Sequence, residues 1–146
     1  MNIKTIAPTA ARVLLGAAFV FFGLNGFLQF LPQPPMPERA ASFGGALAAT
    51  GYMFPLIKGF EVVSGALLLA NRAVPLALLF LAPILVNILG FHLVLEAGAG
   101  LALPVILVAL ELYLAWTLRH VWGPIFSARV TGAPVAQRAH VDAHAE

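Results

Sequence analysis

The sequence predicts an all-α integral membrane protein, an antiparallel four-helix bundle with both termini in the cytoplasm. The chain of 146 residues is 61% hydrophobic, carries only 10% charged residues and has a mean hydropathy of +0.95. A soluble domain carries about 25% charged residues, so this composition excludes an ordinary soluble protein. Four apolar runs approach the roughly 20 residues that a spanning helix needs, and they cover residues 11–31, 54–70, 73–95 and 100–118. We expect them to form one domain over residues 1–122.

The first expected span follows basic residues and could be mistaken for a secretory signal. No small-x-small cleavage pattern follows its apolar core, and the run reaches full spanning length, which favours a membrane span. Arg12, Gly16 and Gly23 recur on one stripe at helical spacing, and the glycines would let another helix approach closely. Asn25 and Gln29 share a different face in the outer half of the span. They either contact a ligand or form hydrogen bonds with neighbouring helices.

The connection after the first span, residues 32–53, divides into two parts. Four prolines at its start prevent helix continuation and favour an extended passage. Residues 38–50 are then rich in alanine, with Phe43 and Leu47 four apart. This pattern predicts a short helix that lies on the outer membrane surface.

The second expected span carries Lys58 and Glu61 inside an otherwise apolar run. A charged residue at the bilayer centre costs about 2.5 to 3.5 kcal/mol on insertion scales, and such residues usually face the protein interior. Lys58 could extend its long stem to the interface or pair with Glu61, which lies three residues away on the same helix face as Gly65. Glu61 has a short stem and must be protonated, paired or near water. Glu61 is therefore the best catalytic candidate, with a structural ion pair as the alternative.

The third and fourth expected spans hold the remaining polar residues. Only Asn71 and Arg72 separate the second span from the third, which predicts a tight turn between antiparallel helices. On the third span, Asn87 lies in the outer half and His92 near the outer end, where His92 and Glu96 can pair.

Glu111 lies midway along the fourth span. We expect it either to form a buried ion pair with Arg12 of the first span or, with no cation nearby, to serve as a neutral proton site.

The expected depth of these residues predicts a shared ligand pocket. Placing the antiparallel spans side by side brings six polar residues to the outer half of the bilayer: Asn25, Gln29, Lys58, Glu61, Asn87 and His92. For helix packing we expect Gly16, Gly23 and Gly65.

The distribution of basic residues predicts the orientation, because Lys and Arg near span ends stay cytoplasmic. One side carries Lys4, Arg12, Arg72, Arg119, Arg129 and Arg138. The other side carries only Arg39. Residues 123–146 are polar and are expected to form a flexible cytoplasmic tail.

Composition and motifs exclude several kinds of chemistry. The chain contains no cysteine, so thiol catalysis and thiolate metal sites are excluded, and no clustered basic stripe indicates nucleic-acid binding. His140 and His144 have helical ligand spacing with Asp142 and Glu146 nearby, but the segment looks unstructured and fixes no third ligand, so we expect no metal site. We expect no covalently bound cofactor.

The order of these patterns resembles the DoxX family of small four-span membrane proteins. In residues 12–23 an arginine is followed by spaced glycines and phenylalanines, as at the start of that family. Residues 51–55, followed by a Gly- and Leu-rich stretch headed by Glu61, resemble its second block. The resemblance covers residues 12–122.

The resemblance implies a multi-pass protein of the inner cell membrane that works with membrane redox systems. The leading hypothesis is a small accessory or oxidoreductase subunit that binds a quinone or a similar lipophilic carbonyl compound, with electrons supplied by a partner enzyme. One alternative is a non-catalytic assembly or scaffold protein, whose glycine stripe on the first span binds another membrane protein. A second is a proton-coupled small transporter that acts as a homo-oligomer. Whether the chain is an enzyme stays open at this point.

Overall fold

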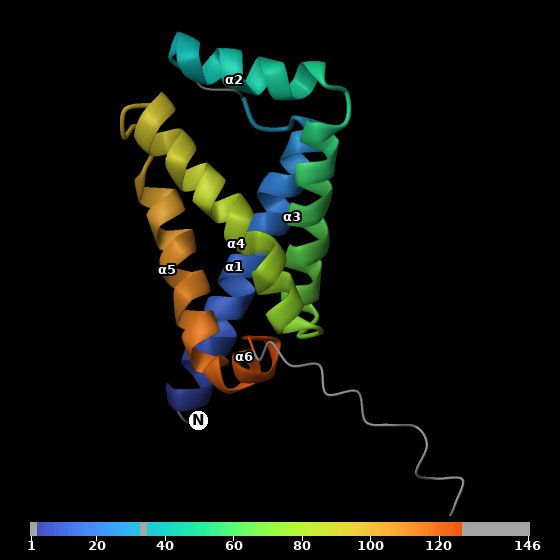
Figure 1. Ribbon diagram of the computed structural model, residues 1–146, viewed down its shortest axis with the longest axis vertical. Helices are drawn as coiled ribbons and strands as arrows, with labels where there is room; N and C mark the ends of the chain where they lie inside the picture. The colour runs from blue at the N-terminus through green and yellow to red at the C-terminus, as the bar shows by residue number, and fades with distance from the viewer. Residues whose placement is uncertain (1–2, 33–34, 127–146) are drawn as a thin grey trace, which may run out of the picture.

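The computed structural model describes residues 3–32 and 35–126, which form helices and short connections without a strand. The helical elements follow one another in this order: α1 (Ile3–Leu28), α2 (Glu38–Ala49), α3 (Met53–Leu69), α4 (Val74–Gly90), the π-helical turn η1 (Phe91–Leu95), α5 (Ala102–Thr117) and α6 (Arg119–Phe126). Helices α1 and α3 run side by side, α5 lies beside α4, α2 crosses one end and α6 lies at the other (Figure 1). The prediction of an all-helical chain is confirmed for the described residues.

Two helical stretches are long and apolar enough to cross a membrane. They are Ile6–Leu28 within α1 and Val74–Leu95, which joins α4 to η1. The count rises to three if α2 and α3, which meet at 92°, are taken as one bent span. Helix α5 is apolar but shorter. The described residues therefore have the character of a membrane protein.

The helix boundaries differ from the expected ones mainly at the two ends of the chain. Helix α1 begins at Ile3 rather than near residue 11, and it ends at Leu28 because Gln29 adopts a left-handed backbone conformation with φ 50°. Helix α6 was not predicted. It continues to Phe126, so a tail that starts at residue 123 is wrong by four residues. The rest of the expected tail, including both of its histidines, lies outside the described residues.

Glycines allow the close approach of α1 and α3. A Cβ atom at Gly16 would lie 2.9 Å from the carbonyl oxygen of Gly65, and one at Gly65 would lie 2.7 Å from the carbonyl oxygen of Gly16. A Cβ atom at Gly23 would lie 2.7 Å from Val62 Cγ2. The three glycines expected to pack helices therefore lie at this contact, inside the chain's own bundle. A larger side chain at any of them would force the helices apart.

The apolar core lies beside this contact and joins α1, α3, α4 and α5. Its innermost side chains, Leu15, Leu68 and Leu81, are fully buried. Burying a leucine side chain contributes about 1.5 to 3 kcal/mol when the alternative is water, but in a bilayer close packing supplies most of the gain. The core thus holds the helices in register below the polar residues of α3.

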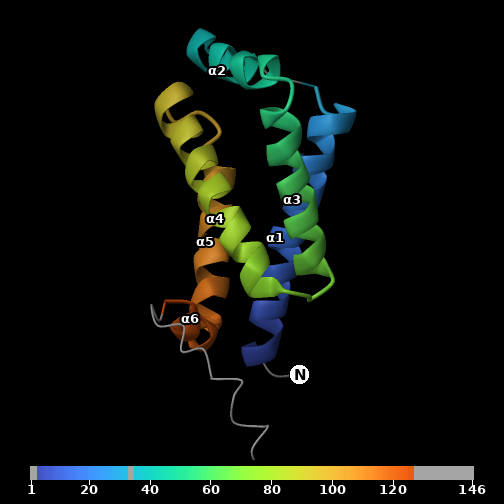
Figure 2. The same cartoon turned by 45° about the vertical axis from the view of Figure 1, so that its right-hand side comes forward.

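Helix α2 turns sharply away from α3 and lies across one end of the bundle formed by the other helices (Figures 1 and 2). Thr50 stabilises the corner, because its hydroxyl donates to the Leu47 carbonyl at 2.6 Å and accepts the Met53 N–H at 3.0 Å. Gly51 takes the positive φ of 73° that the turn needs. Both views show α4 diverging from α3 toward the end that α2 covers.

Candidate functional site

The Lys58–Glu61 ion pair that the spacing suggests is formed on the buried face of α3. Lys58 Nζ donates to Glu61 Oε1 at 3.0 Å and to Oε2 at 2.8 Å. The Glu61 side chain is 3% exposed and that of Lys58 is 20% exposed. Among the described residues the carboxylate has no other hydrogen-bond partner, and Lys58 Nζ has no other hydrogen-bond acceptor but lies over the Phe54 ring, 5.8 Å from its centre. The Glu61 carboxylate is therefore buried, whereas the partly exposed Lys58 ammonium can donate a hydrogen bond to a further acceptor.

Gly26 of α1 makes room for the Lys58 side chain. A Cβ atom at Gly26 would lie 2.5 Å from Lys58 Cγ and 2.6 Å from Cδ. The aliphatic stem therefore lies against the bare backbone of α1. With its stem held in this position, Lys58 extends its ammonium to Glu61, three residues further along α3.

Two cavities meet at the ion pair. One, of about 260 Å³, lies between α1, α3, α4 and α5 and is lined by Phe19 and Phe22 among other apolar residues. The other, of about 410 Å³, lies beneath α2 and is lined by Phe43 and Phe91. Both share four lining residues, which are Lys58, Glu61, Ile88 and His92. An apolar ring in either cavity would contact the charged pair at one edge.

His92 reaches this position from the π-helical turn η1. Its Nδ1 lies 2.8 Å from the Ile88 carbonyl oxygen, which can only accept, so Nδ1 carries the hydrogen. Its Nε2 lies 3.6 Å from Glu96 Oε2, so the expected His92–Glu96 contact is made. Asn87 lines only the cavity beneath α2. Short π-helical turns are frequent at functional sites.

Asn25 of α1 and Gln29, which follows the end of α1, lie outside both cavities. Asn25 Oδ1 accepts the Leu31 N–H at 2.8 Å, and the Asn25 carbonyl accepts the Gln29 N–H at 2.8 Å. Gln29 is exposed. The structure thus brings four of the six expected residues to one place, and it uses Asn25 to finish a helix.

Replacing Asn25 by Ala is expected to lower the free energy of unfolding by about 1 kcal/mol, because the Leu31 N–H loses its acceptor. Gln29→Gly is the matched control, since glycine adopts φ 50° without strain and should leave stability unchanged or slightly higher. Unfolding of purified protein by SDS, followed by circular dichroism, measures both. An unchanged Asn25→Ala variant would contradict the capping role.

The expected Arg12–Glu111 ion pair is not formed. The guanidinium of Arg12 instead donates to the carbonyl oxygens of Leu68 and Leu69, where α3 ends and its last carbonyls lack helical partners. Glu111 is buried on α5, its Oε1 has no hydrogen-bond partner, and no ion pair involves it in the described part of the chain. Arg12 lies at α3 rather than at Glu111 of α5, because the first half of α1 packs on the end of α3.

Sequence reasoning missed several residues that shape the site. Phe22 and Phe91 line the two cavities but look like ordinary membrane-span residues. Gly26 lies on the same stripe of α1 as Gly16 and Gly23, and this stripe predicted helix packing but not the contact of Gly26 with Lys58. Ser64, one turn deeper than Glu61 on α3, is fully buried and its hydroxyl has no hydrogen-bond partner. The buried face of α3 is therefore polar over two turns.

Together, the fold and the site describe an apolar helical protein with a buried ion pair between two cavities. Comparisons of the chain with models of protein families, with curated proteins and with solved structures gave no match in any of the three.

Proposed function

We propose that the chain is a four-span protein of the inner cell membrane with both termini in the cytoplasm. In this arrangement α1, α3, α4 with η1, and α5 cross the bilayer, and α2 lies on the outer surface. Helices α3 and α5 have 17 and 16 residues. At 1.5 Å per residue they extend about 25 Å, close to the roughly 30 Å of the hydrocarbon core. The excess of basic residues at the opposite end from α2 supports the orientation.

We propose further that the chain is a DoxX-like accessory subunit of a membrane redox system and binds a quinone or a similar lipophilic carbonyl compound. The observation that carries this proposal is the Lys58 ammonium, which has no hydrogen-bond acceptor besides Glu61 in the described residues, faces the Phe54 ring at 5.8 Å from its centre, and borders two cavities lined by aromatic rings. A carbonyl oxygen is the neutral acceptor that such a donor binds. The ring would lie beneath α2, against Phe91.

Each polar residue then has a distinct part in binding. Lys58 donates to the carbonyl oxygen, and Glu61 is a positioning residue that holds the ammonium in place. His92 lines the same cavities, with its ring oriented by the Ile88 carbonyl and its Nε2 directed toward Glu96 Oε2. Reduction of a quinone to a quinol takes two electrons and two protons. The electrons come from a partner enzyme, and this chain binds the ring and exchanges protons.

The glycine stripe of α1 does not support the alternative of a scaffold protein. The glycines of α1 that would bind another membrane protein are already packed against α3. A docking role would need a different face of the bundle.

Equilibrium dialysis of the purified chain in nanodiscs with a radiolabelled short-tailed quinone tests the proposal. We expect saturable binding, weakened by about tenfold or more in the double variant Lys58→Met/Glu61→Leu, which removes the donor while filling the space with apolar atoms. Gly44→Leu should also weaken binding, because Gly44 lines the cavity beneath α2 and a Cβ there meets nothing within 4 Å.

Two controls make the result specific. Arg72→Gln removes an exposed positive charge at the opposite end of α3 and should leave quinone binding unchanged. A ring-matched hydrocarbon without carbonyl groups should bind more weakly to the unmodified chain. Equal binding of quinone and hydrocarbon, or full binding by the folded double variant, would refute the proposal.

A further inference from the structure

A second cavity region, separate from the ion pair, lies in a groove between α4 and α5. The groove has a volume of about 400 Å³ and is lined almost wholly by leucine, valine and alanine side chains. Val86 on α4 and Leu112 on α5 form its exposed rim, at 72% and 65% exposure. In a bilayer such a rim faces the lipid. A lipophilic molecule could therefore enter the groove sideways from the membrane.

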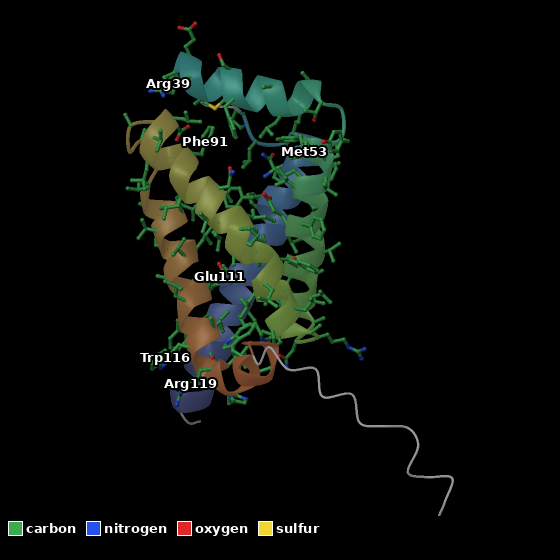
Figure 3. All side chains as sticks on the ribbon, in the orientation of Figure 1. Arg39, Met53, Phe91, Glu111, Trp116 and Arg119 are labelled. Atoms are coloured by element: carbon green, nitrogen blue, oxygen red, sulfur yellow. The ribbon has the colours of Figure 1, made fainter. Side chains whose placement is uncertain are left out.

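Glu111 is the one ionisable residue in the lining of this groove. It is 7% exposed, and its Oε1 is buried without a hydrogen-bond partner. Figure 3 places it near the middle of the bundle, far from the polar ends. A buried polar atom without a partner costs about 1 to 3 kcal/mol, and a buried lone charge costs more. A ligand that supplied a hydrogen-bond donor or a positive charge to Glu111 would therefore bind favourably in the groove.

The basic residues Arg12 and Lys58 do not pair with Glu111. Arg12 donates to the carbonyls at the end of α3, and Lys58 is paired with Glu61. Among the described residues, no basic side chain lies within ion-pair distance of Glu111. With no cation from the described residues, Glu111 either stays neutral or, as a carboxylate, takes a partner from outside that part of the chain.

We propose that the α4–α5 groove binds a lipophilic amine, whose ammonium group pairs with the Glu111 carboxylate while its apolar body fills the groove. An ammonium supplies both the opposite charge and the hydrogen-bond donors that a buried carboxylate requires. The apolar lining matches a hydrocarbon or aromatic body, and about 400 Å³ lies within the usual range of small-molecule sites. A lipid acyl chain fits the same lining but leaves Oε1 unpartnered.

Trp122 provides a reporter inside the groove. It lines the groove from α6, and its indole Nε1 donates to the Ala115 carbonyl at 2.8 Å, which fixes the ring. The chain has two tryptophans. In a Trp116→Phe background, Trp122 is the sole tryptophan, and a bromine atom brought against it will quench its fluorescence.

The experiment titrates the Trp116→Phe chain in nanodiscs with N-hexyl-4-bromobenzylamine and, separately, with the neutral ether of the same shape. We expect saturable quenching by the amine and an apparent affinity about tenfold or more lower in Glu111→Gln. The ether should bind the two chains equally. Glu38→Gln, which removes an exposed carboxyl on α2, should leave amine binding unchanged.

A third variant keeps the test decisive if Glu111→Gln folds poorly. Ala82→Phe places a ring at the exposed rim of the groove and keeps the carboxyl, so it should abolish saturable quenching by the amine. Equal affinity for amine and ether, or no loss of affinity in a folded Glu111→Gln or Ala82→Phe chain, would overturn the proposal and assign the groove to lipid chains. Quinone binding beneath α2 is measured independently.

Discussion

Replacing Lys58 by Met is expected to lower the free energy of unfolding by about 3 to 5 kcal/mol, because it leaves a buried carboxylate alone. Glu61 is 3% exposed, and both of its oxygens accept hydrogen bonds only from Lys58 among the described residues. Methionine is close to the lysine stem in length and shape, so the packing against Gly26 changes little. Unfolding in SDS, followed by circular dichroism, gives the stability of the purified chain.

The double variant Lys58→Met/Glu61→Leu distinguishes two effects on stability. One is the cost of leaving the Glu61 carboxylate unpaired, and the other is the net contribution of the intact ion pair. Apolar residues of similar volume often replace a buried ion pair at little cost, so the double variant should recover most of the stability. Arg72→Met, at an exposed position, should change stability by less than about 0.5 kcal/mol. If the double variant is as unstable as Lys58→Met, the loss of stability does not come from an unpaired carboxylate. It then comes from altered packing around residues 58 and 61.

Local spacing was enough to predict the ion pair, the helical character and most of the helix ends. Lys58 and Glu61 face the same way because three residues make nearly one turn, whatever surrounds the helix. The second, third and fourth expected spans agree with α3, α4–η1 and α5 to within about two residues. These features depend on interactions within one helix or between chain neighbours.

The partner of Arg12 could not be read from the sequence, because it depends on which helices touch. Depth along the spans made Glu111 a candidate, but depth does not distinguish α3 from α5 as the neighbour. The carbonyls of Leu68 and Leu69 at the end of α3 are backbone acceptors, and the Leu68 carbonyl also accepts the Asn71 N–H at 3.1 Å. The residue types in the sequence do not indicate such acceptors. Asn25 was misplaced for the same reason, since its partner is the Leu31 N–H.

The relation of His92 to Asn87 was also beyond sequence reasoning. In a regular α-helix five residues turn the chain through about 500°, which puts the two side chains well apart. Both nevertheless line the cavity beneath α2. The cavity is wide enough to contact different faces of α4 and η1, which spacing along one helix does not predict.

Replacing Gly65 by Ala is expected to destabilise the chain by about 3 kcal/mol or more, because the added methyl group meets backbone atoms that cannot rotate away. The new Cβ would lie 2.7 Å from the Gly16 carbonyl oxygen and 2.8 Å from the Val20 nitrogen. Relief requires α1 and α3 to separate, which opens the core around Leu68. Loss of the folded population, seen in SDS unfolding and in size-exclusion profiles, measures the effect.

Gly59→Ala is the matched control for this change, because it makes the same substitution on the same helix. A Cβ at Gly59 meets nothing within 4 Å, so only helix propensity acts, and alanine should stabilise α3 by up to about 1 kcal/mol. The two variants should therefore differ in sign. Separation of α1 from α3 at Gly65 would also move Gly26 away from the Lys58 stem, so quinone binding should fall with stability in Gly65→Ala and persist in Gly59→Ala. Equal stability of the two variants would show that the bundle does not depend on this contact.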